Sequence, residues 1–185
     1  MDTTAITRHI EQNNFVKISR SLPGCTEDLR GFILAKSASF LLVQETYDFM
    51  FNGYSIMRRA DISSIRNGKF EKTSKRIFKG EGLLASSLGL DVKINLKSWQ
   101  TIFTDLKKLD YHAIIKCEDK EEADFIIGPI KRISNSLVSL QYYDPKGKLK
   151  AKPDHISFPD ITTVTFGDNY STIFREYLVA PEKKA

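Results

Sequence analysis

The residues best suited to binding chemistry are cations gathered within RRADISSIRNGKFEKTSKRIFK, residues 58–79. They are Arg58, Arg59, Arg66, Lys69, Lys72, Lys75, Arg76 and Lys79. If 69–79 is helical, several of its cations recur at helical spacing and share one side. Clustered cations bind phosphates because counterion release favours the complex. The pattern predicts a surface for RNA or another polyanion; the alternative is a solvated hairpin tip and helix face.

Residue types that support catalysis are present, but the sequence does not bring them together. The histidines are isolated from one another: His9, His112 and His155. Asp61 and Asp160 stand at matching places in the two halves of the chain, which favours turn or cap hydrogen bonds over catalysis. The acidic run EDKEEAD (118–124) predicts an exposed loop. We therefore expect no enzyme activity, no cofactor and no metal site; a catalytic site assembled between the halves is the third hypothesis.

Composition and length indicate a folded protein. The chain has 185 residues, of which 41% are hydrophobic and 28% charged, and its net charge of +5 permits an anionic partner. Cys25 and Cys117 have no close-spaced partner, so we expect two reduced thiols. No run approaches the roughly 20 apolar residues of a membrane span, and the N-terminus lacks a signal-peptide pattern. We expect a cytoplasmic protein that does not bind membranes.

The sequence repeats itself at an interval of 97 residues. GFILAKSASFLLVQ (31–44) and GPIKRISNSLVSLQ (128–141) share a glycine, an isoleucine, two serines and a glutamine at matching places. Further along, ADISSI (60–65) matches PDITTV (159–164). Because so many landmarks keep their order, the pattern predicts a tandem duplication.

Each copy has the pattern of five short strands with flanking helices. FVKIS (15–19) alternates apolar and polar residues, and 31–44 divides into two strands at the polar turn KSAS. Helices are predicted at 3–14, 69–79, 97–110 and 169–179, with Trp99 in the core. Five strands suffice for a small closed barrel. We predict a mainly β fold of two tandem five-stranded barrels, 1–80 and 98–185, connected by 81–97.

The order of a helix, a strand, a bent strand pair opened by Gly-x-Ile, and IMRRADI (56–62) resembles the Sm-like family. That resemblance implies a strongly bent five-stranded barrel, with single-stranded RNA bound by two loops in rings of six or seven barrels. In Sm proteins the first motif has a Gly followed by an Asp, then an aromatic residue or His, and then an Asn. This chain has other residues at the last three of these positions. The replacing residues are Ser37, Ser39 and Leu41 in the first copy, and Ser134, Ser136 and Val138 in the second. RRAD (58–61) retains the basic second motif, whereas SFPD (157–160) does not.

The preferred hypothesis is a non-enzymatic interaction or scaffold module of tandem Sm-like barrels that binds RNA or another polyanion through the first barrel. The alternative is a protein–protein adaptor or self-assembling oligomer module without nucleic-acid binding. Such a module would pair barrel edges or bury the aromatic segment YDFMFNGY (47–54) against a partner or a second copy. Exposure of Phe49, Met50 and Phe51 would favour this alternative.

Overall fold

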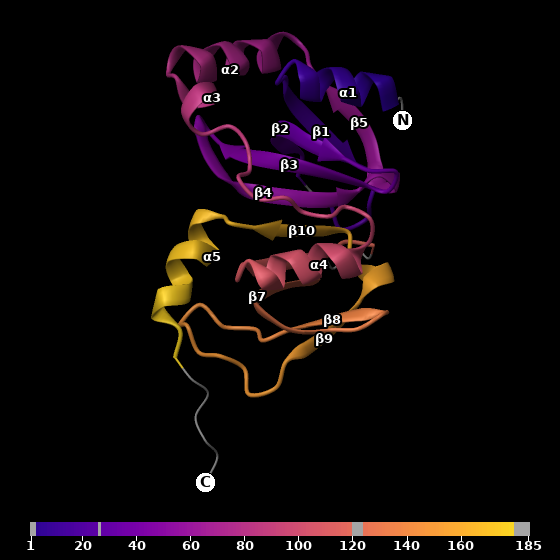
Figure 1. The fold of residues 1–185 in the computed structure, drawn as a ribbon, viewed down its shortest axis with the longest axis vertical. Coiled ribbons are helices and arrows are strands. Elements are labelled where there is room, and N and C mark those ends of the chain that lie inside the picture. The colour runs from indigo at the N-terminus through magenta and orange to yellow at the C-terminus, as the bar shows by residue number, and fades with distance from the viewer. Residues whose placement is uncertain (1–2, 26, 120–123, 180–185) are drawn as a thin grey trace.

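The computed structural model describes residues 3–25, 27–119 and 124–179, and these form a mainly β fold (Figure 1). The strands of the first half are β1 (Phe15–Arg20), β2 (Leu29–Lys36), β3 (Phe40–Tyr47), β4 (Met50–Arg58) and β5 (Ile62–Arg66). Those of the second half are β6 (His112–Cys117), β7 (Asp124–Ile133), β8 (Leu137–Leu140), β9 (Asp154–Ser157) and β10 (Thr163–Phe166). The predicted mainly β class is confirmed.

Helices precede and follow each set of strands. The α-helices are α1 (Thr3–Glu11), α2 (Lys69–Gly80), α3 (Leu83–Ser86), α4 (Trp99–Lys108) and α5 (Asn169–Phe174). Short 3-10 helices are η1 (Arg59–Asp61), η2 (Phe158–Asp160) and η3 (Arg175–Tyr177). Ser98 caps α4 by accepting a hydrogen bond from the Thr101 amide, as its position before an apolar helical pattern predicts. No helix of the described segments is long and apolar enough to cross a membrane.

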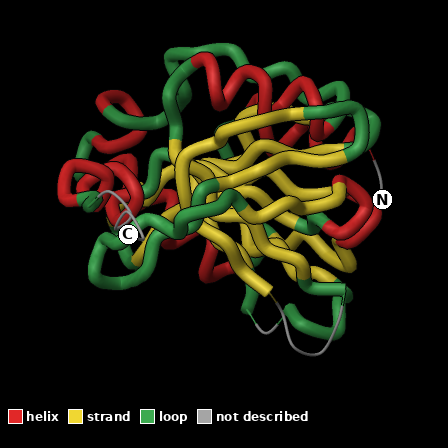
Figure 2. The backbone as a smooth tube through the Cα atoms, turned by 90° about the horizontal axis from the view of Figure 1, so that it is seen from below, coloured by secondary structure: helices red, strands yellow, loops and turns green. Residues whose placement is uncertain are grey.

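All ten strands belong to one antiparallel sheet in the order β5-β1-β2-β3-β4-β10-β6-β7-β8-β9. The order of the first five strands recurs in the second five, and β4 of the first half pairs with β10 of the second. In Figure 1 the first half lies above the second, and Figure 2 shows how the strands curve. Among the described residues the sheet is open, with β5 and β9 as its edges. Two closed barrels therefore stay a prediction.

Local details also repeat between the halves. The β2–β3 pairing shifts register between Ile33 and Ala35, and the β7–β8 pairing shifts between Ile130 and Arg132, 97 residues later. Such bulges bend a strand strongly. A 3-10 helix follows the fourth strand of each half. The halves are thus two copies of one strand arrangement, joined edge to edge.

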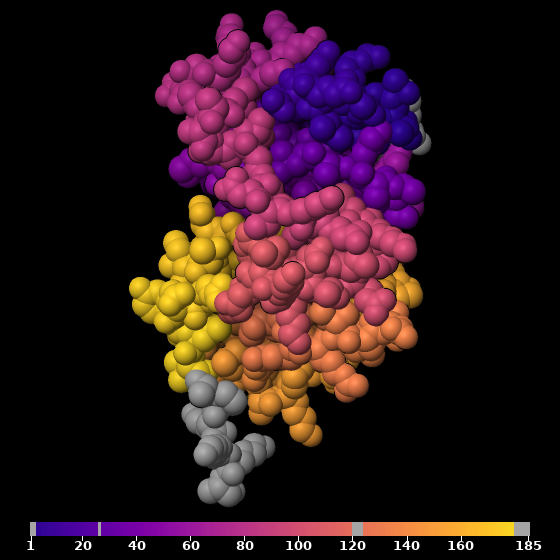
Figure 3. All heavy atoms as spheres, viewed as in Figure 1, coloured from indigo at the N-terminus to yellow at the C-terminus, as the bar shows by residue number. Residues whose placement is uncertain are grey.

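The largest core cluster extends across both halves. Phe40 of β3 packs edge to face on Trp99 of α4, with ring centroids 4.6 Å apart, and Trp99 is buried as predicted. The connection 81–97 contributes Ile94 and Leu96 to the same cluster. Its backbone is also fixed to the sheet, since the Tyr54 hydroxyl donates to the carbonyl of Gly89 over 2.8 Å. In Figure 3 this connection crosses the face where the two halves meet.

Candidate binding surfaces

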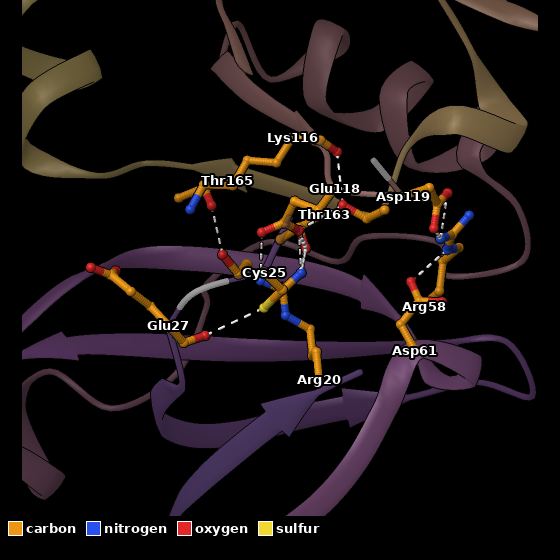
Figure 4. A network of polar contacts seen from close by, with 12 residues as sticks. Arg20, Cys25, Glu27, Arg58, Asp61, Lys116, Glu118, Asp119, Thr163 and Thr165 are labelled. Atoms are coloured by element: carbon orange, nitrogen blue, oxygen red, sulfur yellow. Dashed lines mark hydrogen bonds and ion pairs between the residues drawn. The ribbon is translucent and has the colours of Figure 1, made fainter. Parts of the chain in front are cut away.

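Arg58 joins the two halves. It stands at the end of β4, and its Nε donates to Oδ2 of Asp61 over 2.6 Å. Its Nη2 donates to both carboxylate oxygens of Asp119 over 3.0 Å (Figure 4). Its Nη1 donates to the carbonyl of Pro159 over 2.8 Å. Burial alone would lower the pKa of this guanidinium, but the hydrogen bonds to the two aspartates raise it. Arg58 therefore serves the junction between the halves.

Three further predicted cations also contact the protein itself. Arg59 donates from Nη1 to the carbonyl of Ser37 over 2.9 Å, which ties η1 to the β2–β3 turn. Arg66 donates from Nη2 to Glu71 over 2.6 Å, and Lys75 donates to the carbonyl of Gln12 over 2.6 Å. These contacts attach the three side chains to other parts of the first half.

The remaining four predicted cations lie on the outer side of α2. They are Lys69, Lys72, Arg76 and Lys79, and all four are exposed. Their spacing of three, four and three residues places them on one side of the helix. Within the described residues, none of their side chains has a hydrogen-bond or ion-pair partner. Sequence reasoning thus placed eight cations in one surface, and the structure leaves four of them together and unpaired.

Arg20 and Glu118 form a buried ion pair that the sequence did not reveal. Their side chains are only 6% and 5% exposed, and Nη2 of Arg20 donates to Oε1 of Glu118 over 2.9 Å. Thr162 donates a further hydrogen bond to Oε2 over 2.7 Å. Burial alone would raise the pKa of Glu118, but the hydrogen bonds from Arg20 and Thr162 lower it. The arginine belongs to β1 and the glutamate follows β6, so this pair also joins the halves (Figure 4).

This pair corrects the prediction of an exposed loop at 118–124. Glu118 is buried against Arg20, and Asp124 is the first residue of β7. Residues 120–123 lie outside the described part of the chain. Charge density suggested solvent exposure for the whole run, whereas the sheet order places an arginine of the other half against its first carboxylate.

A small polar cavity of about 100 Å³ lies beside this junction. Ser55 of β4 donates to Glu45 and shares a hydrogen bond of 2.7 Å with Thr165 of β10. Burial raises the pKa of the Glu45 carboxyl above its ordinary value. Side-chain hydrogen bonds therefore add to the backbone hydrogen bonds between β4 and β10.

A larger cavity of about 380 Å³ lies between the start of β7 and the edge strand β9; we call it the β9 groove. Ile126 and Ile156 form apolar walls, and Asp119, Asp124 and Asp160 supply carboxylates. Cys117 also lines the groove, and burial together with these carboxylates raises the pKa of its thiol to about 11. Such a thiol is protonated near neutral pH and is a poor nucleophile.

His112 and His155 each contact another side chain of the protein. His112 is buried with its ring centroid 5.7 Å from that of Tyr143, and burial followed by the charge of Arg175 lowers its pKa to about 4. His155 shares a hydrogen bond of 2.7 Å with Ser139. No group of three or more His, Cys, Asp or Glu side chains in the described segments is arranged to hold a metal ion.

The β3–β4 hairpin exposes large apolar side chains. Tyr47, Phe49 and Met50 are 69%, 48% and 63% exposed, whereas Phe51 packs on Phe78 of α2 with centroids 5.1 Å apart. Within the segment 47–54, the exposed apolar side chains are therefore those of the hairpin tip. This is the exposure that the adaptor hypothesis requires for two of its three residues.

Comparison of the chain with models of protein families, with curated proteins and with solved structures gives no match.

Proposed function

We propose that the chain is a non-enzymatic interaction module of two fused Sm-like units, and that the outer side of α2 binds RNA or another polyanion. The observation that carries this proposal is the row of four exposed cations on α2, which have no ion-pair partner among the described residues. Phosphates displace condensed counterions when they meet such a row, so binding needs no base-specific contacts. The loops that carry the motifs of the resemblance contribute no free cation, because Arg58 and Arg59 contact the protein.

A salt series with a fluorescent single-stranded RNA tests this proposal. We expect affinity to fall steeply with salt, and the double variant Lys72→Gln/Arg76→Gln to reduce the slope of log K against log salt by about 1–2. The matched control is Lys97→Gln/Lys108→Gln, which removes two exposed cations away from α2, one at the end of the connection 81–97 and one on α4. Equal effects of the two double variants, or undetectable binding at low salt, would reject the α2 surface.

The exposed hairpin tip favours a second candidate, a protein-binding adaptor. Tyr47, Phe49 and Met50 form an apolar projection whose burial against another protein is favourable by roughly 25 cal/mol per Å². The pairing of Tyr47 with Met50 at the hairpin end holds these side chains on a defined turn. The same residues do not contribute charge, so this surface is separable from α2.

The adaptor proposal is tested with the double variant Phe49→Ser/Met50→Ser. We expect the variant to bind less of an apolar fluorescent dye and to show less concentration-dependent association, while its unfolding midpoint changes little because both side chains are exposed. The control is Phe70→Ser, which removes an apolar side chain of 77% exposure on α2. An unchanged response of the hairpin variant would exclude the hairpin tip as the apolar contact.

A further inference from the structure

The β9 groove has a counterpart in the first half. The cavity between the halves is lined in part by Arg20, Glu27, Asp28 and Leu29. The β9 groove is lined in part by Cys117, Asp124, Phe125 and Ile126, and each of these residues lies 97 positions after its equivalent in the first set. The same place in the repeated unit is therefore a cavity of about 100 Å³ in one half and of about 380 Å³ in the other.

An added strand accounts for the smaller cavity in the first half. β10 pairs with β4 in an antiparallel register from Thr163 opposite Met57 to Phe166 opposite Tyr54. Thr163 and Thr165 of β10 then line the cavity. In the second half the equivalent strand is β9, and no described strand pairs with its outer edge. The larger groove is the uncovered form of a site that a strand fills elsewhere in the same molecule.

The charges differ between the two sites. The first half has Arg20 and Arg58, and the residues at the equivalent places of the second half are Cys117 and Ser157. Asp61 accepts a hydrogen bond from Arg58, whereas its equivalent Asp160 has no such partner among the described residues. Asp124, at the other side of the groove, likewise lacks an ion-pair partner in the described segments. The β9 groove thus has Asp160, the equivalent of Asp61, but no arginine at the place equivalent to Arg58.

We propose that the β9 groove binds an extended segment of another protein that carries an arginine. The segment adds to the sheet as an antiparallel strand along β9, as β10 does along β4. Its guanidinium contacts Asp124 and Asp160, and the methylene stem of the arginine packs between Ile126 and Ile156. A planar fork of donors suits separated carboxylates, as Arg58 shows between Asp61 and Asp119.

A second copy of this chain fits the groove less well. Its free edge, β5, would bring Arg66 to the place that Thr165 occupies on β10, but Arg66 is already bonded to Glu71. The Glu71 side chain is 4% exposed, and removal of its arginine would leave a buried carboxylate without its cation. The junction pairs made by Arg20 and Arg58 also have no equivalents at these outer edges. The inference goes beyond the α2 and hairpin surfaces and uses residues of neither.

The test uses short blocked peptides based on β10, whose sequence is TVTF. One peptide has arginine in place of the first threonine, because Thr163 lies opposite Met57, whose equivalent on β9 is Ile156 of the groove wall. A matched peptide has citrulline there, which keeps the shape without the charge. Amide NMR shifts of the full chain locate binding, and titration gives the dissociation constant. We expect the arginine peptide to perturb β9 and the start of β7, and to bind about tenfold more tightly than the citrulline peptide. Blocked arginine amide, which cannot form a strand, should bind more weakly still.

Variants then separate the groove from general charge attraction. Asp124→Asn/Asp160→Asn should weaken the arginine peptide by about tenfold and leave the citrulline peptide unchanged. The control Glu11→Gln/Asp91→Asn makes the same charge change at exposed positions elsewhere. Absence of binding, binding that is insensitive to the groove variant, or concentration-dependent perturbation of β9 by the chain alone would overturn the proposal. The last result would identify a second copy as the occupant, and none of these results bears on RNA binding by α2.

Discussion

At the level of single residues, the junction between the halves depends on a buried charge pair. Arg20 and Glu118 are 98 positions apart in the sequence, and both side chains are almost fully enclosed. Their hydrogen bonds to each other and to threonine hydroxyls replace hydrogen bonds to water, whereas Nε of Arg20 is buried without a partner among the described residues. Removal of one member would leave the other charged and buried, which is a larger cost than the loss of an exposed pair.

We predict that Glu118→Ala lowers the free energy of unfolding by about 3–5 kcal/mol. The matched control is Asp154→Ala, which breaks an exposed pair with Lys150 and should cost about 0–1 kcal/mol. Urea unfolding measures both. Because the pKa of Glu118 is lowered in the folded state, its contribution is present above the unfolded pKa and is lost as pH falls through the folded pKa. Equal costs for the two variants would contradict this account.

The sequence predicts some residues of the junction and not others. Trp99 is predicted to be buried because apolar residues recur at helical spacing along 97–110, and local periodicity suffices for that inference. The contacts of Arg20 with Glu118 and of Arg58 with Asp119 depend on β4 lying next to β10. No local pattern encodes which strands become neighbours, so the arginines appear in the sequence only as unpaired cations.

At the level of elements, two glycines fix the close approach of neighbouring strands. A Cβ atom on Gly31 would overlap the carbonyl oxygen of Gln44, and one on Gly128 would overlap that of Gln141. These glycines lie within the second strand of each half, β2 and β7, and are 97 residues apart. The two matching positions of the sequence repeat therefore require glycine for the same steric reason.

We predict that Gly31→Ala and Gly128→Ala each destabilise the protein by more than about 2 kcal/mol, because backbone atoms must separate to admit a methyl group. Gly80→Ala is the control, since no atom lies within 4 Å of a Cβ placed at this last residue of α2. That change should be neutral or stabilise the protein by up to about 1 kcal/mol. Thermal unfolding followed by circular dichroism compares the three, and a neutral Gly31 variant would show that the strands can separate without cost.

Most elements are predictable from local patterns, but their lengths are less so. The helices at 69–79 and 97–110 match α2 and α4 closely, and α4 buries the apolar residues that recur at helical spacing. The predicted helix at 169–179 ends at Phe174 and continues as the 3-10 turn η3. The segment YYDPKGKLK (142–150) has the Asp-Pro-Lys-Gly sequence of a hairpin turn, and its strands are reduced to an isolated bridge between Tyr143 and Leu149 with backbone hydrogen bonds on either side. The apolar periodicity of these segments is weak. Tertiary contacts therefore determine where these elements end.

At the level of the whole molecule, the two halves share a sheet and a core. β10 lies between β4 and β6, so the backbone pairing is continuous across the junction. Phe40, Leu42 and Ile56 of the first half belong to the same buried cluster as Trp99 and Phe103 of α4. Repetition in the sequence predicts two similar units, but the edge that joins them follows from the pairing of β4 with β10. That pairing makes the halves energetically dependent on each other.

We predict that the chain unfolds in one cooperative transition. Trp99 is the only tryptophan and contacts Phe40 of the other half, so its fluorescence reports on the shared core. The fluorescence midpoint in urea should coincide with the midpoint of the far-ultraviolet circular dichroism signal, which reports on both halves. Separated midpoints would show that one half unfolds before the other. Ser98→Ala, which removes the cap of α4, should move both midpoints together.

The position of β10 in the sheet has a consequence for synthesis on the ribosome. All five strands of the first half are made by residue 66, and β3 can pair with β4 at once, yet β4 gains its second neighbour, β10, only after residue 166 has left the exit tunnel. For the time needed to make the intervening hundred residues, at roughly 5–20 residues per second, the nascent chain carries an unpaired strand edge and part of an uncovered core. Translation pauses in that interval should therefore promote misassociation of nascent chains, and chaperones that shield strand edges should suppress it.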